Sequence, residues 1–335
     1  MTEAPVLDVR GLEKYFPVHQ SMIDSLLRKH QGQVKAVDNV SFSLTRGEVL
    51  AIVGESGCGK TTIAKTLIGL EKPTHGEILF HGQLIRDKPD RAKTIGLKQL
   101  RQRVQMIFQD PYESLNPRAK IAEIVSEPLV VHGIAKDPLE RRAVVRSALE
   151  DAGLRPAQDY LSRYPHELSG GQRQRVVIAA ALVLRPELLI ADEPVSMLDV
   201  SIRAEIINLL VDLRRTRDIS VIFITHDLGT VGYFADRVAV MYLGRIVEIG
   251  TVQEVLKNPQ HPYTQALLSV VPVPNPRLRK NRIILQGETP NPIDLPKGCR
   301  FHPRCPAAIN ICKASDPQLI QLEGSHQAAC LLLVK

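Results

Sequence analysis

The chain has 335 residues, of which 44% are hydrophobic and 24% are charged. This ordinary globular composition excludes fibrous, disordered and disulfide-scaffold proteins, and the length predicts a main domain with an appendage. The central apolar run Val176–Leu184 is about half the roughly 18 residues that a membrane span requires, so we expect no segment that crosses a bilayer. Because Met1–Pro5 lacks the basic start and apolar core of a secretory signal, we expect a cytoplasmic protein whose five cysteines do not form disulfides.

The charge balance favours an anionic partner. Lys and Arg number 43 against 36 Asp and Glu, a net charge of +7, which suits a nucleotide, a nucleic acid or an anionic membrane surface. With no Trp and only 4% aromatic residues, the chain offers few rings on which single-stranded nucleic acid could stack. We therefore expect no nucleic-acid partner.

Short apolar runs alternate with helical patterns along the first 250 residues. A loop or short helix, His19–Gln33, is expected before the core. Runs rich in Val and Ile predict buried parallel strands at Val49–Val53, Val104–Phe108, Leu188–Ala191 and Val221–Ile224. Helical spacing recurs at Thr62–Leu70, Gln172–Leu184 and Ser201–Leu213. Strands that alternate with helices predict an α/β fold around a parallel sheet.

Two stretches depart from this alternation. Residues 110–168 are poor in strands and contain helix-like segments such as Leu139–Ala152, which predicts an inserted helical subdomain over about 110–178. From residue 251 the chain holds 11 of its 23 prolines and four of its five cysteines. We therefore expect a main domain over 1–250 and a separate, loop-rich appendage over 251–335.

A phosphate site is predicted directly after the first of these strands. Gly54–Thr61, with Thr62 beside it, fits the P-loop pattern between a strand and a helix. Its glycines let backbone N–H groups converge on phosphate, Lys60 reaches the outer phosphates, and the Thr61 hydroxyl binds magnesium. The predicted residues are Gly54, Ser56, Gly57, Cys58, Gly59, Lys60, Thr61 and Thr62, with Cys58 interpreted as a small residue and not as a reactive thiol.

A pair of carboxylates ends the third predicted strand. Asp192 stands at the carboxyl edge of the sheet, where it is a candidate to bind the magnesium ion that accompanies ATP. Glu193 follows, and its carboxylate is the candidate to polarise a water molecule aimed at the γ-phosphate. The P-loop upstream favours this catalytic interpretation over a solvated acidic turn.

The motif Leu168–Gln172, Leu-Ser-Gly-Gly-Gln, opens a helix directly upstream of the carboxylate strand. On this motif the chain resembles an ABC-type ATPase. The resemblance implies a P-loop NTPase core of ABC type, in which the signature of one subunit closes over the nucleotide on the P-loop of its partner. A helix start that presents a hydroxyl and free N–H groups suits an anion. The candidate contacts are Ser169, Gly170, Gly171 and Gln172.

Further motifs of this family follow in order. Gln109, after the second strand, matches the glutamine that contacts the metal and the attacking water and links to the membrane subunits. Asp199 matches the loop that crosses the dimer, and His226 matches the histidine at the γ-phosphate. Phe16 is the candidate to stack on adenine, with Tyr15 as the alternative. Because no catalytic position is degenerate, we expect hydrolysis of ATP to ADP and phosphate, with Glu193, His226 and Gln109 catalytic.

The resemblance narrows to the importers of dipeptides and oligopeptides. It rests on Gln109–Tyr112 with Ser114–Arg118, on Tyr164–Glu167, and on the stretch His261–Leu268. It implies that this chain is the second ATPase of a heterodimeric pair, which works with two transmembrane permease subunits and, indirectly, an extracytoplasmic substrate-binding protein. The chain would be peripheral on the cytoplasmic face of the membrane. Nickel complexes, glutathione and oligosaccharides remain alternative cargoes. A soluble ABC ATPase acting on nucleic acid or ribosomes is less expected, because Gly170 follows Gly57 by only 113 positions.

Four cysteines gather in the appendage: Cys299, Cys305, Cys312 and Cys330. Their spacing lacks the tight pairs typical of zinc sites, which favours an iron-sulfur cluster; zinc and unliganded thiols remain alternatives. Similar importer ATPases carry a four-iron four-sulfur cluster here, and Arg300–Pro306 matches their pattern. Nearby Lys297, Arg300, Arg304 and Lys313 are expected to offset the negative charge of the thiolates.

Overall fold

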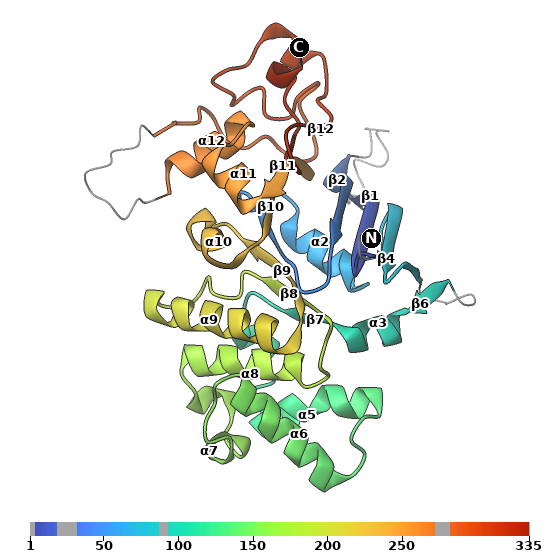
Figure 1. The fold of residues 1–335 in the computed structure, drawn as a ribbon, viewed down its shortest axis with the longest axis vertical. Helices are drawn as coiled ribbons and strands as arrows, with labels where there is room; N and C mark the ends of the chain where they lie inside the picture. Colours follow the sequence, from blue (N-terminus) through green and yellow to red (C-terminus); the bar gives the residue numbers. More distant parts are fainter. Residues whose placement is uncertain (1–3, 19–31, 87–92, 272–281, 335) are drawn as a thin grey trace, which may run out of the picture. The chain divides into compact units, whose positions relative to one another are not determined.

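The computed structural model describes residues 4–18, 32–86, 93–271 and 282–334 (Figure 1). They form two compact units. The first contains Met1–Asp8, Ser43–Val49 and Leu79–Ile224, and the second contains Val9–Phe42, Leu50–Ile78 and Thr225–Lys335. Most of the stretch predicted as an insertion, residues 19–31, lies outside the described residues. No helix in the described part of the chain is both long and apolar enough to span a membrane.

Three parallel strands carry the catalytic motifs of the first unit. They are β7 (Val104–Ile107), β8 (Leu188–Asp192) and β9 (Ser220–Thr225). Strand β8 pairs in parallel with both β7 and β9. Every residue of β8 and β9 is buried, which explains why both strands are continuous apolar runs without polar alternation. The α/β fold and these strand positions are confirmed.

Helices fill the chain between β7 and β8. They are α4 (Pro111–Ser114), α5 (Ile121–His132), α6 (Pro138–Asp151), α7 (Gln158–Leu161) and α8 (Gly170–Leu182). In Figure 1 these helices, in green, lie together, and α5, α6 and α8 pack against one another. Proline at the first turn and a capping aspartate, Asp137, define the start of α6.

The remaining elements of the first unit are short, apart from one long helix. Helix α9 (Val200–Arg217) follows the carboxylate strand and ends on three arginines near its C-terminus, where positive charge complements the helix dipole. Strand β4 (His75–Phe80), of which only Leu79 and Phe80 belong to this unit, pairs antiparallel with β5 (Gln83–Arg86). Strand β5 pairs in parallel with β6 (Thr94–Gly96). Helix α3 (Leu97–Arg103) leads into β7.

The second unit pairs the strand before the phosphate loop with strands from late in the chain. Strand β3 (Val49–Val53) lies parallel to β10 (Arg237–Tyr242), which pairs antiparallel with β11 (Arg245–Thr251). Two short tail strands, β13 (Gln327–Ala328) and β12 (Ile320–Gln321), continue this order antiparallel. The sheet is therefore mixed, whereas the sequence pattern predicted parallel strands only.

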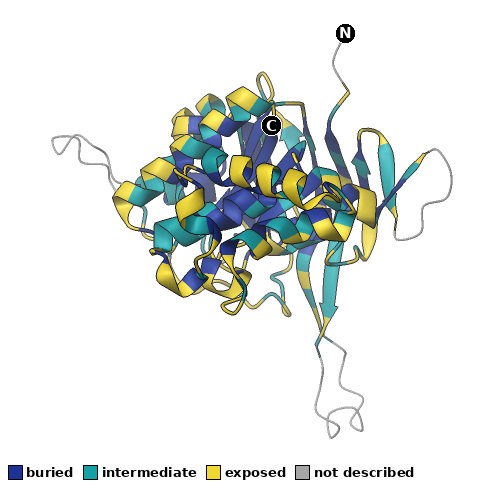
Figure 2. Cartoon of the chain, turned by 90° about the horizontal axis from the view of Figure 1, so that it is seen from below, coloured by how far each residue is buried: buried dark blue, intermediate teal, exposed yellow. Residues whose placement is uncertain are grey.

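Helices and two early strands complete the second unit. Strands β1 (Leu7–Pro17) and β2 (Gln33–Leu44) come from the start of the chain. The helices are α2 (Lys60–Leu67), α10 (Leu228–Phe234), α11 (Val252–Lys257) and α12 (Pro262–Ser269). Buried positions, dark blue in Figure 2, lie on the strands and on the inner sides of the helices. Strands β1 and β2 were not predicted, although buried positions alternate with more exposed ones over part of their length.

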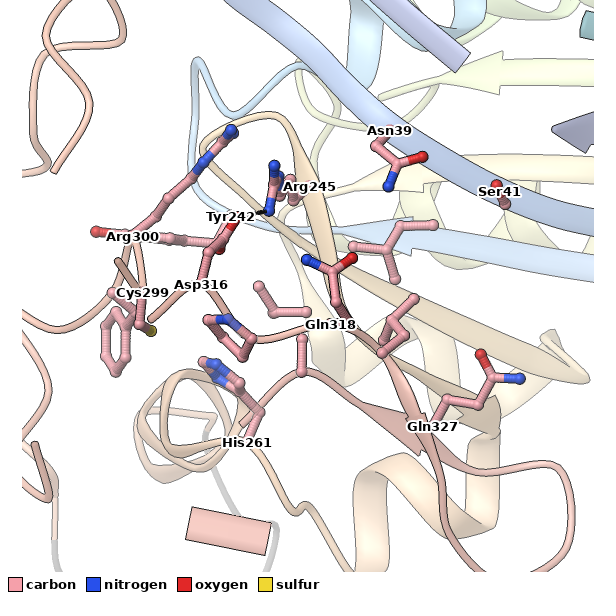
Figure 3. Close-up of a pocket in the computed structure, with 16 residues that line it drawn as sticks. Asn39, Ser41, Tyr242, Arg245, His261, Cys299, Arg300, Asp316, Gln318 and Gln327 are labelled. Carbon is pink, nitrogen blue, oxygen red and sulfur yellow. Dashed lines mark hydrogen bonds and ion pairs between the residues drawn. The ribbon is translucent and has the colours of Figure 1, made fainter. Parts of the chain in front are cut away.

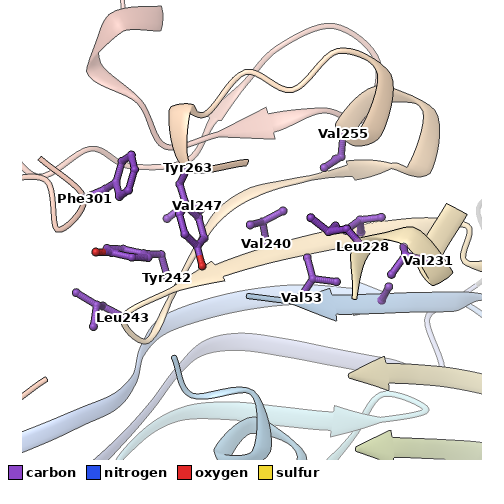
Figure 4. Close-up of a cluster of buried hydrophobic side chains, with 12 residues drawn as sticks. Val53, Leu228, Val231, Val240, Tyr242, Leu243, Val247, Val255, Tyr263 and Phe301 are labelled. Atoms are coloured by element: carbon purple, nitrogen blue, oxygen red, sulfur yellow. The ribbon is translucent and has the colours of Figure 1, made fainter. Parts of the chain in front are cut away.

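One hydrophobic core joins the phosphate-loop strand to the C-terminal region. Val53 of β3, Val240 and Tyr242 of β10, Tyr263 of α12 and Phe301 of the tail belong to the same buried cluster (Figure 4). The Tyr242 and Tyr263 rings are 4.7 Å apart between centroids, and Phe301 lies edge-on to Tyr242 at 5.2 Å. The expected boundary at residue 250 stays a prediction, but these side chains show that the tail packs on the phosphate-loop strand.

Candidate functional site

The phosphate loop has the predicted context, with β3 before it and α2 after it. Gly59 has a φ of 108°, and a Cβ atom there would lie 2.0 Å from the backbone oxygen of Ala36. Only glycine satisfies both the left-handed backbone and this close approach. Gly57 also has a positive φ, of 78°. The glycines of the motif thus shape the loop directly.

The start of α2 is free of side chains that would compete with a phosphate. No side-chain hydrogen bond caps the helix, and its first turn contains no acidic residue. The Lys60 ammonium donates to the backbone oxygens of Gly54 at 2.8 Å and Glu55 at 2.9 Å, inside the loop itself. Helix N–H groups with a lysine beside them form an anion site. Burial raises the pKa of the Cys58 thiol, in agreement with a packing role.

Glu55, inside the same loop, was not among the predicted site residues. Its backbone N–H donates to the Tyr263 hydroxyl at 3.0 Å, and its carboxylate accepts hydrogen bonds from Arg304 and Thr289. The P-loop pattern leaves this position open, so the motif gave no reason to single it out. The partners lie more than 200 residues away in sequence.

Tyr15 and Phe16, the two candidates for adenine stacking, differ in their surroundings. The Tyr15 hydroxyl donates to the buried Asp38 carboxylate at 2.5 Å, so this ring is held by a structural hydrogen bond. The Phe16 ring has the Lys14 ammonium over its face, at 4.7 Å from the centroid. The assignment of Phe16 stays a prediction.

His226 follows β9, as the motif order requires, and its side chain is exposed. The turn around it is fixed by its neighbours: the Asp227 N–H donates to the Thr225 hydroxyl, and the Asp227 carboxylate caps α10 at Gly229. A rigid turn that presents an exposed imidazole suits contact with a phosphate. This role also stays a prediction.

In the first unit, two predicted catalytic residues meet. Strands β7 and β8 run in parallel with Ile107 opposite Ala191, so the residues that follow them emerge at one edge. The Gln109 side-chain amide donates to the Glu193 carboxylate at 3.4 Å, across 84 residues of sequence. An amide beside a carboxylate can orient a water molecule for attack on a phosphate.

The two carboxylates of the pair differ in exposure. Asp192 ends β8 with 2% of its surface exposed, whereas Glu193 is only half-buried. Glu193 has a φ of 46°, a left-handed conformation that is uncommon for a residue other than glycine, and its N–H donates to the Ile224 oxygen at 2.9 Å. Backbone strain of this kind concentrates at functional sites.

The signature motif caps α8. The Ser169 hydroxyl accepts a hydrogen bond from the Gln172 N–H at 3.3 Å, and the Gln172 side chain accepts one from the Ser169 N–H at 3.0 Å. A Cβ atom at Gly171 would lie 2.8 Å from the Ile202 side chain of α9, so a small residue is needed here. In this conformation the Ser169 hydroxyl and Gln172 act as a capping box.

Asp199 caps the next helix, α9, without a side-chain hydrogen bond, and it is exposed. The loop before it is closed by Ser196, whose N–H and hydroxyl both contact the Glu193 oxygen. The loop between Glu193 and Asp199 is therefore ordered by two hydrogen bonds to the Glu193 backbone oxygen. An exposed aspartate at this point is available for contact with another chain.

The C-terminal cysteines influence one another. Burial raises the pKa of the Cys299 thiol to about 11, and the charges of Cys312 and Cys305 add to this. Burial likewise raises the pKa of Cys330, with further contributions that include Cys312. Within the described ranges, however, no group of three His, Cys, Asp or Glu side chains is arranged to hold a metal ion. The structure thus gives no support to the expected metal site.

Two arginines expected to balance the thiolates have other partners. Arg300 pairs with Asp38 and donates to the Leu243 oxygen, while Arg304 pairs with Glu55. Arg245 also binds Asp38, and Figure 3 shows Arg245, Arg300 and Cys299 around one pocket of about 270 Å³. Asp38 and Glu55, two acids of the same unit, engage both guanidinium groups, so the expected charge balance of Arg300 and Arg304 with the cysteines has no support here.

Comparison with known proteins agrees with these motifs. The ABC transporter family model matches residues 37–196, and the model for the C-terminal region of oligopeptide/dipeptide transporters matches residues 247–312. Oligopeptide transport ATP-binding protein AppF of Bacillus subtilis is 49% identical over 98% of this chain and 97% of its own length. The chain belongs to the family of ABC-type peptide-transport ATP-binding proteins.

Two further matches illustrate the family and its fold. Dipeptide transport ATP-binding protein DppF of Escherichia coli is 46% identical over 98% of this chain and 94% of its own. The ATP-binding cassette MJ0796, solved as a dimer in a post-hydrolysis state with ADP and Pi, is 27% identical with a TM-score of 0.62, over 73% of this chain and 98% of that one. The ABC-type fold is thereby confirmed.

Proposed function

We propose that this chain is the ATP-hydrolysing subunit of a membrane importer that takes up dipeptides or oligopeptides. The observation that carries the proposal is the complete motif series, with Gln109 in contact with Glu193, in a chain whose whole length matches peptide-transport ATP-binding proteins. This chain carries the ATPase motifs, whereas the class of cargo, peptides, is inferred from the relatives.

Each predicted residue takes one task in hydrolysis. The loop of Gly54–Thr61 and the N-terminus of α2 bind the phosphates, with Lys60 turning from its loop carbonyls toward the outer phosphates. Thr61, Gln109 and Asp192 would hold magnesium, which neutralises charge that develops on the phosphates. Glu193 polarises the attacking water, and His226 contacts the γ-phosphate.

Partners follow from the position of the signature motif. We infer that Ser169, Gly170, Gly171 and Gln172 complete the nucleotide site of a second ATPase subunit, with Asp199 on the same interface. Two transmembrane permease subunits and an extracytoplasmic binding protein would complete the transporter. The chain would then lie at the cytoplasmic face of the membrane without entering it.

The assembled transporter tests this function. The chain, its partner ATPase and the permease subunits are reconstituted in proteoliposomes, and ATP hydrolysis is measured with and without binding protein loaded with a peptide. We expect the peptide-loaded binding protein to accelerate hydrolysis. If a binding protein loaded with a sugar or a nickel complex accelerated hydrolysis, and peptide-loaded protein did not, the ATPase role would stand and the peptide cargo would be wrong.

We propose in addition that Cys299, Cys305, Cys312 and Cys330 bind a four-iron four-sulfur cluster. Support comes from the donor set in the sequence, four cysteines within one loop-rich segment that gains from a staple. Protein purified anaerobically should be brown with about four irons per chain, and Cys305→Ser should remove the colour. Colourless wild-type protein would overturn the cluster.

A further inference from the structure

The C-terminal region reaches the phosphate loop through Glu55. Arg304 makes a two-pronged ion pair with this carboxylate, 2.8 Å from Nη1 to Oε2 and 3.2 Å from Nη2 to Oε1. The Thr289 hydroxyl donates to the same Oε2 at 2.8 Å. A bidentate arginine–carboxylate pair fixes geometry as well as charge.

The backbone of Glu55 is held as firmly as its side chain. Its N–H donates to the Tyr263 hydroxyl, and its oxygen accepts from the Lys60 ammonium. Tyr263 is fully buried against Tyr242 and Phe301. A single residue of the phosphate loop is thus restrained by α12, by the segment before the cysteines and by the cysteine segment itself.

The negative charge of Glu55 is unfavourable in a loop that binds phosphate. A carboxylate one residue into an anion-binding loop opposes the loop's positive potential unless a cation neutralises it. Arg304 supplies that cation at a position where only 10% of its side-chain surface is exposed, so solvent screens the pair little. Burial alone would lower the pKa of Arg304, but the hydrogen bonds to Glu55 raise it, which keeps the guanidinium charged.

We propose that Arg304 is a positioning residue for ATP binding: it neutralises and orients Glu55, so that the C-terminal region sets the affinity of the phosphate loop. This rests on the proposed function, because it takes the loop to bind ATP. Arg304 acts on the loop through Glu55, so its loss should raise the KM for ATP with little change in kcat.

A charge-compensation cycle tests the proposal on the full chain. ATP affinity is measured for the wild type, Arg304→Gln, Glu55→Gln and the double variant, with Arg282→Gln as a control that removes the same charge from an exposed position. We expect Arg304→Gln to weaken ATP binding about five- to tenfold, because it leaves the loop carboxylate unpaired. The double variant should recover most of this loss, since the offending charge is gone.

Each outcome decides a different point. Wild-type affinity in Arg304→Gln would overturn the positioning role, and so would a double variant as weak as Arg304→Gln, because that result marks a merely structural contact. Arg304→Lys, which keeps the charge, serves if Arg304→Gln fails to fold, and it should bind ATP more tightly than Arg304→Ala. If the wild-type chain bound no ATP, and Lys60→Ala gave the same result, the proposed function itself would be contradicted.

Discussion

The phosphate loop and the C-terminal region illustrate two ways in which a sequence encodes structure. The loop is specified by eight consecutive residues, Gly54–Thr61, whose glycines, lysine and threonine each have a local reason to be there. The C-terminal region is specified by contacts across the chain: Arg304 reaches Glu55 over 249 residues, and Arg300 reaches Asp38 over 262. A motif can therefore be recognised alone, whereas the region that supports it cannot.

The largest expected effect is on chemistry in the motif region. Glu193→Gln should leave ATP binding nearly intact and slow hydrolysis by about 10²- to 10⁴-fold, because only the partner of the attacking water is lost. Phosphate release by the purified transporter measures this. Turnover equal to that of the wild type would show that Glu193 is not catalytic. The control for loss of charge is Glu205→Gln, which changes an exposed acid on α9.

The next effect examines whether the two regions share one core. Phe301 is 2% exposed and packs with Tyr242 and Tyr263 beside the phosphate-loop strand. Phe301→Ala should lower the free energy of unfolding by about 3–5 kcal/mol, measured by denaturant titration. The half-exposed tail residue Leu332 is the control, and its replacement by Ala should cost far less.

Because the core is shared, Phe301→Ala should also speed amide hydrogen exchange in the phosphate loop. Exchange confined to the tail would show that the two regions are independent. The phosphate loop and the C-terminal region would then behave as two uncoupled domains.

A smaller effect is expected at the phosphate-loop lysine. Lys60→Ala removes charge-assisted contacts worth about 1.5–3 kcal/mol each, so ATP affinity should fall roughly 10- to 100-fold. Equilibrium binding of ATP to the purified chain measures it. Lys65→Ala, in the last turn of the same helix, should bind as the wild type does; equal weakening of both would point to the helix and not to the loop.

The smallest effect concerns acid sensitivity of the C-terminal region. Burial lowers the pKa of His261 to about 4, whereas the unfolded chain takes up its proton near 6.5. Between these values only the unfolded state is protonated, so stability falls as the pH drops through this window. At pH 5 the loss should be on the order of 2 kcal/mol relative to pH 7.

His261→Asn isolates this contribution. His261 Nδ1 accepts the Tyr263 N–H at 3.1 Å as the N-cap of α12, and asparagine preserves such a cap without titrating. The difference in unfolding free energy between pH 7 and pH 5 should therefore shrink in this variant. An unchanged difference would assign the acid sensitivity to other groups.

The predictable part of the structure is the part whose signal is local. Val49–Val53 and Leu188–Ala191 could be located because fully buried strands are continuous apolar runs, and Asp192 and Glu193 because they follow the second of these runs. Gln109 and Glu193 were each predicted as catalytic residues, but their contact was not predicted and arises because the parallel strands β7 and β8 end at one edge.

The remainder depends on pairings that leave no local trace. The antiparallel addition of β11, β13 and β12 is set by register between segments far apart in sequence. Basic residues beside the cysteines suggested that their charge balances the thiolates, but Arg300 forms an ion pair with Asp38. A buried ion pair depends on which side chains the fold brings together, and neither partner's neighbours in sequence reveal it.

Accumulation of a labelled peptide in proteoliposomes tests the central claim, that ATP hydrolysis on this chain powers peptide uptake. The vesicles carry the wild-type chain in the assembled transporter. The peptide and its binding protein are placed on one side of the membrane, and ATP is placed on the opposite side, where the ATPase lies. These vesicles should concentrate the peptide. Vesicles with Glu193→Gln should bind ATP and accumulate at least about 10²-fold more slowly. Equal accumulation by Glu193→Gln, or ATP hydrolysis without accumulation of any dipeptide or oligopeptide, would contradict the account.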